Sequence, residues 1–262
     1  MSVKSLGNPI ALGRTAEVYA WKEGYVLKLF HEWFPSGEVE YEARIAGVVQ
    51  EAGLPAPAAG EVVEIDGRYG LVYERVIGAS MTEALVSRPW TVGQSARVLA
   101  ELQAGMHRVE GVRDLPSQHE RLREKIRAAE KLSPDLREAV LKALEQLPQG
   151  NRLCHGDFHP GNVLMTGEGA LVIDWIDATR GNPLADVARS TIILMGAAAS
   201  DQISNPFMKA FARLFHAAYV RHYFSLCPGG EHEYRHWLPI VAAARLSENI
   251  PELERWLVAQ LP

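Results

Sequence analysis

The stretch His155-Gly156-Asp157-Phe158-His159-Pro160-Gly161-Asn162 decides how this sequence of 262 residues is interpreted. Asp157 and Asn162 lie five positions apart, so one short loop can hold one side chain at a reacting hydroxyl and the other at a metal ion. Between them, Pro160 stiffens the turn and Gly161 is expected to adopt an unusual backbone angle. Carboxylate and amide oxygens are ligands that Mg²⁺ accepts. The loop therefore predicts a site that combines a metal ion with a reactive carboxylate.

A second carboxylate follows at a fixed distance. Asp174 lies seventeen residues after Asp157, at the end of the apolar run Leu171-Val172-Ile173, which reads as a strand. Phosphoryl transfer requires Mg²⁺ held by carboxylate and amide oxygens and a carboxylate near the attacking hydroxyl, and protein kinases have the same separation between the Asp and the Asn of their catalytic loop. A single Asp in a loop is more often a turn cap than a catalytic group. The ordered set of three favours catalysis.

A lysine in the N-terminal part completes the pattern. Lys28 lies in the apolar strand Val26-Leu27-Lys28-Leu29-Phe30, where burial of its charge is costly unless it is paired. In the helix expected over residues 38–52, Glu42 shares the face of Ile45 and Val49, whereas Glu40 does not. Glu42 is therefore the predicted partner of Lys28, with Glu38 as the second candidate.

The order of elements indicates an α+β fold with two lobes. The first ~75 residues read as strands and one helix, with Asp66-Gly67 as a hairpin turn. From Ser80 onward apolar residues recur at helical spacing, and Ser133-Pro134 begins one of the helices. We expect a small β-rich lobe over residues 1–76 and a larger α-helical lobe over residues 77–262. A cleft between such lobes is a usual place for a ligand.

The pattern His155-Gly156-Asp157 with Asn162, followed by Ile173-Asp174-Trp175, resembles the aminoglycoside phosphotransferase and choline kinase superfamily, which has a protein-kinase-like fold. The resemblance implies that Asp157 is the catalytic base and that Asn162 and Asp174 bind Mg²⁺. It also implies that His155 is a structural residue that braces the loop. The expected enzyme is a phosphotransferase that moves the γ-phosphate of ATP or GTP to a hydroxyl of a small molecule.

The same resemblance assigns the nucleotide site. Lys28 would contact the α- and β-phosphates, and the loop around Gly13, which departs from a glycine-rich pattern, would cover them. Backbone groups near Glu74 and Val76 would bind the adenine edge. Ile173 would form part of the apolar floor beneath the base.

Three further polar residues, Asp186, His159 and Asp177, are expected around the loop. The run Gly181-Asn182-Pro183-Leu184-Ala185-Asp186 is similar to a family pattern in which an Asp stands where this chain has Asn182. Asp186 is expected to accept backbone hydrogen bonds and fix the catalytic loop. His159 points to the phosphate or the acceptor, or only packs. Asp177 touches the acceptor, or is only solvated.

The acceptor itself stays open. Aromatic side chains of the C-terminal helices would suit a quaternary ammonium cage, as in a choline- or ethanolamine-type kinase, but aromatic residues at helical spacing more often form a core. Carboxylates would suit a polycationic aminoglycoside, yet the C-terminal glutamates form no dense run. A protein kinase is less favoured because no peptide-binding activation segment follows Asp174. A pseudokinase that only binds nucleotide is less favoured because Lys28, Asp157, Asn162 and Asp174 are all present. The candidate aromatic wall residues are His216, Tyr219, Tyr223, Tyr234, His236, Trp237 and Trp256.

Composition excludes several other classes. The net charge of −5 disfavours nucleic acid as a partner. The chain has no apolar run of the ~18 residues that would cross a membrane, and its N-terminal stretch lacks the apolar core of a secretion signal. Two cysteines without CxxC spacing predict neither a metal cluster nor a disulfide framework. We therefore expect a cytoplasmic monomer or homodimer whose partners are a nucleotide and a small hydroxyl-bearing acceptor.

Overall fold

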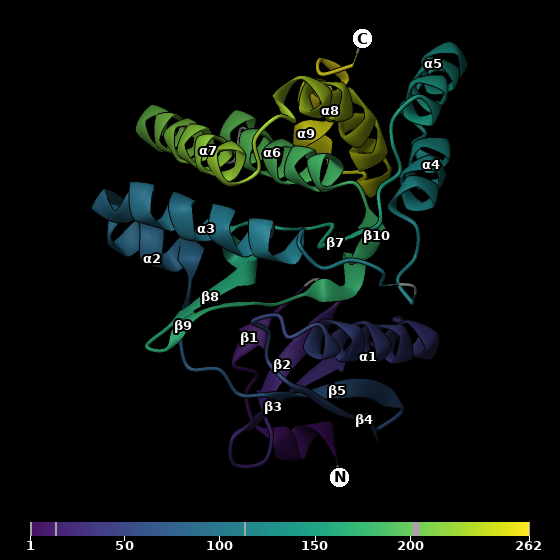
Figure 1. The fold of residues 1–262 in the computed structure, drawn as a ribbon. Coiled ribbons are helices and arrows are strands. Elements are labelled where there is room, and N and C mark those ends of the chain that lie inside the picture. The colour runs from purple at the N-terminus through teal and green to yellow at the C-terminus, as the bar shows by residue number, and fades with distance from the viewer. Residues whose placement is uncertain (1, 14, 113, 201–204, 262) are drawn as a thin grey trace. The chain divides into compact units, whose positions relative to one another are not determined.

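The computed structural model describes residues 2–13, 15–112, 114–200 and 205–261, which divide into two units (Figure 1). The first unit holds residues up to Ser80 together with Val163–Ile176, and the second holds Met81–Asn162 and the residues from Asp177 onward. The boundary expected after residue 76 lies close to this division. Val163–Ile176, however, folds with the first unit, whereas the sequence interpretation assigned it to the second lobe.

An antiparallel sheet of five strands forms the centre of the first unit, in the order β1-β2-β3-β5-β4. Two-residue hairpin geometry joins β4 to β5, because Asp66 and Gly67 have φ values of 49° and 76°, as a turn with two positive φ angles requires. The predicted strands and their hairpins are therefore present. The strands are β1 (Ala11–Leu12), β2 (Ala16–Ala20), β3 (Tyr25–Phe30), β4 (Ala59–Ile65) and β5 (Arg68–Glu74).

In the described part of the first unit there is one α-helix, α1 (Ser36–Glu51), which packs on β4 and β5. Its buried side chains include Val39, Ile45 and Val49, spaced as one helical face. Glu42 lies on that same buried face. A carboxylate in this position is costly unless it is paired, so the packing of α1 requires a cation close by.

A second, small sheet explains why Val163–Ile176 joins the first unit. β6 (Ala79–Ser80) pairs with β8 (Val163–Thr166), and β8 pairs with β9 (Gly169–Val172). In addition, the backbone N–H of Val172 donates to the carbonyl of Pro55 at 2.7 Å. These long-range hydrogen bonds cannot be inferred from spacing along the chain.

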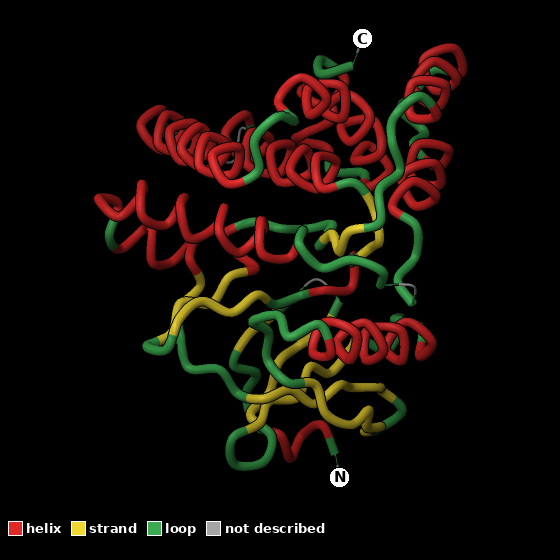
Figure 2. Tube along the Cα trace, viewed as in Figure 1, coloured by secondary structure: helices red, strands yellow, loops and turns green. Residues whose placement is uncertain are grey.

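The second unit is mainly helical, with long loops between its helices, as Figure 2 shows. Among its described residues, the strands β7 (Arg152–Cys154) and β10 (Thr179–Gly181) pair in antiparallel fashion, and β7 leads into the loop that carries Asp157. Helix α3 packs on α7, and α6 packs on both α7 and α8. The α-helices are α2 (Met81–Ser87), α3 (Val92–Met106), α4 (Gln118–Ala128), α5 (Pro134–Glu145), α6 (Pro183–Ala199), α7 (Pro206–Leu226), α8 (Glu231–Arg245) and α9 (Pro251–Val258). Single 3₁₀ turns occur at η1 (Val3–Leu6), η2 (Pro89–Thr91), η3 (Pro160–Asn162), η4 (Trp175–Asp177) and η5 (Leu246–Glu248).

Local sequence signals account for several helix boundaries. The Ser133 hydroxyl accepts from the N–H of Leu136, so this residue is the predicted cap of α5. Helix α4 ends at Ala128, because Ala129 already has extended backbone angles. Leu132 is buried nonetheless.

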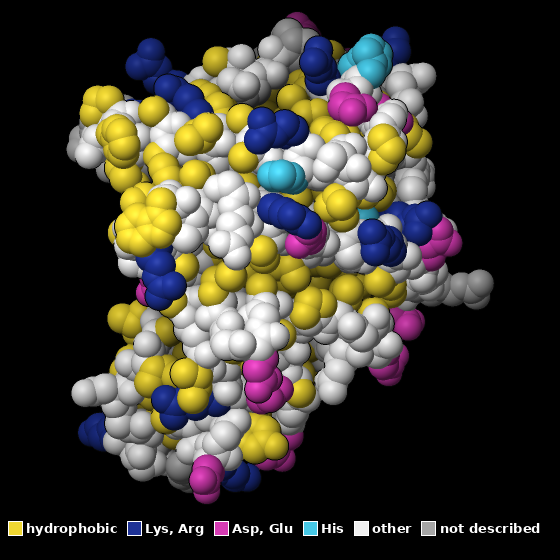
Figure 3. Space-filling view, turned by 60° about the vertical axis from the view of Figure 1, so that its left-hand side comes forward, with side chains coloured by type: hydrophobic (Ala, Val, Ile, Leu, Met, Phe, Trp, Pro, Cys, Tyr) yellow, Lys and Arg dark blue, Asp and Glu magenta, His cyan; other side chains and the backbone are white. Residues whose placement is uncertain are grey.

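Most aromatic residues of the C-terminal helices belong to the core. Tyr219, Tyr223, Tyr234 and Trp237 are each less than 10% exposed. Their placement agrees with packing and not with the walls of an open acceptor cage. The face drawn in Figure 3 shows hydrophobic and charged side chains interspersed. Among the described residues, no helix has both the length and the apolar character needed to cross a membrane.

One half-buried histidine, His216, predicts how stability depends on pH. His216 on α7 contacts the Thr191 hydroxyl at 3.0 Å, and burial lowers the pKa of His216 to about 4. Below the ordinary histidine pKa of about 6.5, His216 binds a proton in the unfolded chain but stays neutral in the folded chain until the pH approaches 4. The free energy of unfolding therefore falls as the pH drops. At pH 5 the loss relative to pH 7.5 should be about 2 kcal/mol. Urea unfolding at both pH values measures it.

The matched variants for this test are His216→Gln and His232→Gln. Glutamine at position 216 can still form a hydrogen bond with Thr191 but cannot take up a proton. The loss of unfolding free energy between pH 7.5 and pH 5 should therefore be about 2 kcal/mol smaller in this variant than in the unmodified chain. His232 is exposed on α8, and its replacement should leave the difference between the two pH values unchanged. An identical loss in His216→Gln and the unmodified chain would contradict the assignment.

Candidate active site

The loop that carries Asp157 begins where β7 ends and finishes in η3. Gly156 has φ of 82°, and a Cβ at this position would lie 2.3 Å from the carbonyl oxygen of Asp177, so glycine is required. The expectation of an unusual angle at Gly161 was wrong, since Gly161 does not have a positive φ. Gly161 is needed for another reason: a Cβ there would lie 2.7 Å from the ring of His159.

One buried carboxylate anchors this loop. Asp186 is 1% exposed and accepts hydrogen bonds from the backbone N–H groups of Gly156 at 2.7 Å and His155 at 3.2 Å. From α3, the Gln103 amide donates at 2.9 Å and the His107 ring lies at 3.1 Å. Burial alone would raise the pKa of Asp186, but these contacts outweigh it and hold the pKa below its usual value. Asp186 thus fixes the loop backbone, as the sequence led us to expect.

The position of Asp186 follows from the cap of α6. Asn182 is the N-cap, and its side-chain oxygen accepts from the N–H of Leu184 at 2.9 Å. Pro183 occupies the first turn, as is common in helices. Asn182 is thus one of the residue types that cap helices best. The cap sets where α6 begins, and Asp186 follows in its first turn.

His155 braces the loop from inside. The side chain is fully buried, and its Nδ1 accepts from the backbone N–H of Asp157 at 3.2 Å. Its ring lies 5.6 Å from that of Phe158, which is also buried. These contacts fix the backbone conformation at Asp157.

Replacing Asp186 with Asn should destabilise the protein strongly. The variant loses the charge that four donors converge on and places an amide N–H₂ against some of them, which should lower the free energy of unfolding by about 3–5 kcal/mol. Urea unfolding at neutral pH measures this change. The exposed Asp114→Asn is the matched control and should stay within about 0.5 kcal/mol. A loss below about 1 kcal/mol in Asp186→Asn would show that the network does not hold the fold.

The carboxylate of Asp157 is held by three side chains of the second unit. Arg189 lies 3.2 Å from one carboxylate oxygen, and His159 Nε2 lies 3.6 Å from the other. The amide nitrogen of Asn162 donates to the backbone carbonyl of Asp157 at 2.9 Å and to its side chain at 3.4 Å. Burial favours a raised pKa, but His159 and the positive charge of Arg189 outweigh it and hold the pKa of Asp157 well below its usual range. Asp157 is therefore a permanent carboxylate near neutral pH.

Arg189 is a site residue that the sequence interpretation missed. Its side chain is 11% exposed, and besides Asp157 it donates to the carbonyl of Gly156 at 3.0 Å and pairs with Glu248 at 2.7 Å. A signal did exist, because Arg189 interrupts an otherwise apolar helical run and follows Asp186 by one turn. A charged residue in such a run is a candidate for a buried pair.

A second cluster of charged side chains lies in the first unit around Lys28. The Lys28 ammonium donates to Glu42 at 2.8 and 3.0 Å and to Asp174 at 3.1 Å. Burial lowers the pKa of Lys28, but the two carboxylates outweigh that effect, and its pKa is raised. The pairing of Lys28 with Glu42 is therefore the one that helical spacing indicated. Tyr73, which the sequence did not single out, donates its hydroxyl to Glu42 at 2.8 Å.

Asp174 has an uncommon backbone conformation. Its φ is 64°, in the left-handed region that residues other than glycine rarely adopt, although Asp and Asn tolerate it best. Strained positions of this kind cluster at functional sites. The side chain follows β9 and is 45% exposed, so one carboxylate oxygen can bond to Lys28 while the other stays accessible.

The donor types of Asn162 and Asp174 suit Mg²⁺. Asn162 uses its amide nitrogen on Asp157, so its amide oxygen is the atom that it can offer to a cation. Asp174 offers a carboxylate oxygen. Mg²⁺ prefers such oxygen ligands and usually retains several waters. Asn162 belongs to the second unit and Asp174 to the first.

The remaining predicted residues all lie in the first unit. The N–H of Gly13 donates to Ala16 at 2.9 Å, in the turn between β1 and β2, whereas its neighbour Arg14 lies outside the described residues. Glu74 ends β5, and its N–H donates to Ala58 at 2.9 Å. The two other predicted residues, both half-buried, are Val76 and Ile173.

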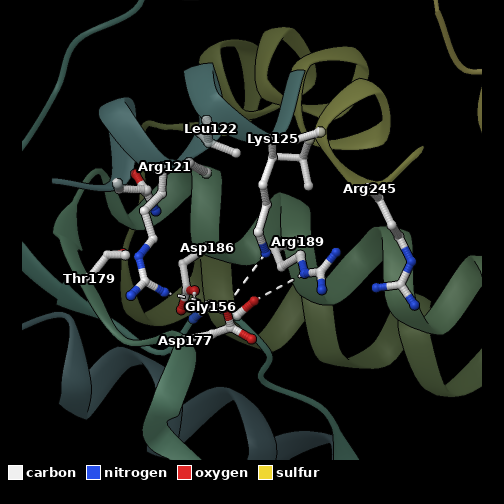
Figure 4. Close-up of a pocket in the computed structure, with 13 residues that line it drawn as sticks. Arg121, Leu122, Lys125, Gly156, Asp177, Thr179, Asp186, Arg189 and Arg245 are labelled. Carbon is white, nitrogen blue, oxygen red and sulfur yellow. Dashed lines mark hydrogen bonds and ion pairs between the residues drawn. The ribbon is translucent and has the colours of Figure 1, made fainter. Parts of the chain in front are cut away.

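A small cavity of about 50 Å³ lies in the second unit next to the loop (Figure 4). Asp177 reaches into it and pairs with Arg121 and Lys125, each at 3.5 Å. The cavity also reaches Gly156, the neighbour of Asp157. Asp177 is therefore held by two cations of α4, where the sequence left its role open.

Known proteins resemble this chain both in sequence and in fold. The model of the phosphotransferase enzyme family matches residues 7–237. A structure of amicoumacin kinase with AMP-PNP, Ca²⁺ and Ami is similar, with a TM-score of 0.68, 14% identity, and coverage of 99% of this chain and 87% of that one. An aminoglycoside-3'-phosphotransferase of type VIII gives 0.61 at 21% identity, covering 92% and 91%. A choline/ethanolamine kinase family protein from Mesorhizobium loti gives 0.58 at 18% identity, covering 97% and 86%. No curated protein sequence matches this chain.

Proposed function

Because the chain belongs to the phosphotransferase enzyme family, we propose that it moves the γ-phosphoryl group of ATP or GTP to a hydroxyl of a small molecule. The observation that carries the proposal is the carboxylate of Asp157, held by Arg189 and Asn162 in a loop that Asp186 anchors. A fixed carboxylate of this kind suits the positioning of a hydroxyl for attack on phosphorus.

The low pKa of Asp157 defines the part that it plays. A carboxylate that holds a proton so weakly is a poor base at the start of the reaction, but it is a good acceptor for the hydrogen bond of a hydroxyl group. In a loose transition state the hydroxyl becomes acidic only as its bond to phosphorus forms. Asp157 therefore orients the hydroxyl first and accepts its proton late.

Lys28 and its neighbours would handle the donor nucleotide. The ammonium of Lys28 is charged and fixed by Glu42, so it can lie against the α- and β-phosphates without first having to be ordered. Tyr73 fixes Glu42 in turn. This arrangement supports a structural role for Glu42 and a direct contact for Lys28.

Mg²⁺ is the metal that we assign to Asn162 and Asp174. When bound, it would offset the negative charge of the transferring phosphoryl group. The amide nitrogen of Asn162 stays on Asp157, which keeps the catalytic carboxylate and the ligand oxygen in one rigid unit. The backbone near Glu74 and Val76 would take the adenine edge, Ile173 would contact its face, and the turn at Gly13 would cover the phosphates.

The acceptor could also be a metabolite of the choline or ethanolamine type. A quaternary ammonium needs an aromatic cage, whereas Tyr219, Tyr223 and Trp237 are buried in the helical core. Their burial favours a different acceptor.

A screen of nucleotide consumption tests the proposal. The chain is incubated with Mg²⁺ and either ATP or GTP, and ADP or GDP release is measured across aminoglycosides, amino-alcohols, sugars, polyols and hydroxy acids. Release that depends on one acceptor class and stops with EDTA is the expected result. Nucleotide binding with no release for any acceptor would point to a binding module instead, and phosphorylation of proteins alone would point to a protein kinase.

A further inference from the structure

The cavity next to the catalytic loop is lined by an unusual number of cations. Arg121 and Lys125 come from α4, Arg189 from α6 and Arg245 from the end of α8, and all four surround a space of about 50 Å³ (Figure 4). Gly156 forms part of the same wall, so the space borders the loop that holds Asp157. A cation-lined cavity beside a reactive carboxylate suggests what the acceptor carries.

Asp157, Asp177 and Glu248 form ion pairs with these cations. Most of these ion pairs are long. Asp177 lies 3.5 Å from both Arg121 and Lys125, and Glu248 lies 3.9 Å from Lys125 and 3.6 Å from Arg245. Strong charge-assisted hydrogen bonds are about 2.7–2.9 Å long. Most of these pairs are therefore loose, and their cations can turn toward a further anion with little loss.

The shorter ion pairs both involve Arg189. Arg189 lies 2.7 Å from Glu248 and 3.2 Å from Asp157, so its charge is used in holding the catalytic carboxylate. Asp186 also lines the cavity, but its oxygens accept from the backbone of Gly156 and from the Gln103 side chain. Counted with Asp186, four carboxylates face the four cations, so the formal charges balance, and the loosely paired Arg121 and Lys125 are the cations that a further anion can reach.

Access and size narrow the choice of ligand. The side chains of Arg121 and Lys125 are 28% and 33% exposed, so a solute can reach them. A cavity needs about 10–15 Å³ to hold one water molecule, so a space of about 50 Å³ has room for one small group. A carboxylate or phosphate group meets both conditions, because Arg121 and Lys125 can turn to it from their long pairs with Asp177.

Building on the phosphotransfer proposed above, we propose that this cavity binds an anionic group of the acceptor. Arg121 and Lys125 hold the carboxylate or phosphate, and the hydroxyl to be phosphorylated extends past Gly156 to Asp157. The acceptor is then an anionic alcohol, such as a hydroxy acid or a phosphorylated polyol. A polycationic aminoglycoside is disfavoured, because its ammonium groups would face like charges.

The first test compares acceptors that differ in charge. ADP release is measured with hydroxy acids, sugar acids, phosphorylated polyols, the neutral alcohols and sugars that correspond to them, and aminoglycosides. The highest kcat/KM should belong to an anionic acceptor, and replacing its carboxylate with an amide should reduce kcat/KM about tenfold or more. Comparison of carboxylates with phosphates identifies which anion the site takes. A best acceptor that is neutral or polycationic would overturn the proposal.

Variants on one helix locate the anion site. Lys125→Gln and Arg121→Gln should each raise KM for the best anionic acceptor about 10–100-fold, because each loses one charge-assisted hydrogen bond, while kcat changes little. Arg127→Gln is the matched control, since Arg127 is exposed on the same helix α4, and its KM should be unchanged. Equal KM values in all three variants would place the anion elsewhere and defeat the proposal.

A binding measurement separates this inference from the phosphotransfer itself. If no acceptor supports ADP release, the proposed reaction fails, and the anion site is decided by heat unfolding in sodium phosphate or sodium citrate against sodium chloride of equal ionic strength. Phosphate or citrate should raise Tm in the unmodified chain and in Arg127→Gln, but not in Lys125→Gln. No rise, or an equal rise in all three proteins, would overturn the anion site.

Discussion

Replacing Asp157 with Asn should lower kcat for phosphoryl transfer by about 10²–10⁴-fold and leave the affinity for nucleotide nearly unchanged. Asparagine has almost the same shape, and its single side-chain oxygen can still accept from either Arg189 or Asn162, which donate to different oxygens of Asp157. It cannot accept the proton of the hydroxyl, and it removes the negative charge that orients that hydroxyl. Steady-state kinetics with the acceptor identified in the screen measure kcat, and calorimetric titration with ATP measures the affinity.

The fold should tolerate this change. Arg189 retains Glu248 at 2.7 Å, so the loss of charge at position 157 does not leave a buried guanidinium alone. Asp135→Asn, an exposed change at the start of α5, serves as the matched control and should keep full activity. Undiminished turnover in Asp157→Asn would refute the role of Asp157 as the acceptor of the proton.

Replacing Asp174 with Asn should lower the transfer rate by about 10²–10³-fold and increase the Mg²⁺ concentration needed for half-maximal rate. Asparagine is chosen because it tolerates the φ of 64° at this position, so the backbone need not change. An amide oxygen is a weaker ligand for Mg²⁺ than a carboxylate. Rate measurements over a series of Mg²⁺ concentrations separate a weaker metal site from a general loss of activity.

Glu42→Gln provides the contrast that this test needs. Asp174 and Glu42 both bond to Lys28, so either change disturbs the lysine, but only Asp174 is assigned to the metal. Glu42→Gln should therefore slow transfer and weaken ATP binding without changing the Mg²⁺ dependence. The exposed Glu64→Gln on β4 should change neither quantity. If Asp174→Asn and Glu42→Gln have the same Mg²⁺ dependence, Asp174 serves only to hold Lys28.

The residues predicted from sequence are those whose expected function imposes a spacing. Asp157 and Asn162 share one loop, and Glu42 follows from the period of a single helix, so both could be recognised without a fold. Arg189 and Tyr73 act through contacts with residues far away in the chain. Their partners become evident only once the helices and strands have packed.

The differences between the sequence interpretation and the structure have the same origin. The hydrogen bonds of β6 with β8 bring residues 163–176 into the first unit, and nothing in the spacing of those residues indicates this pairing. Likewise, the need for glycine at position 161 comes from the ring of His159, which the loop folds back on itself. A sequence pattern specifies which residue type stands at a position, but the reason can depend on a neighbour in space.

The position of Asp186 has a consequence for the dynamics of the catalytic loop. Gln103, which donates to Asp186, also accepts from the Tyr219 hydroxyl, so the carboxylate is bonded to α3 and, through it, to α7. The N–H of Gly156 can exchange its hydrogen with solvent only when the bond to Asp186 opens. Its exchange should therefore be as slow as that of the core helices and should report global unfolding. Substrates then meet a loop that is already in its working conformation.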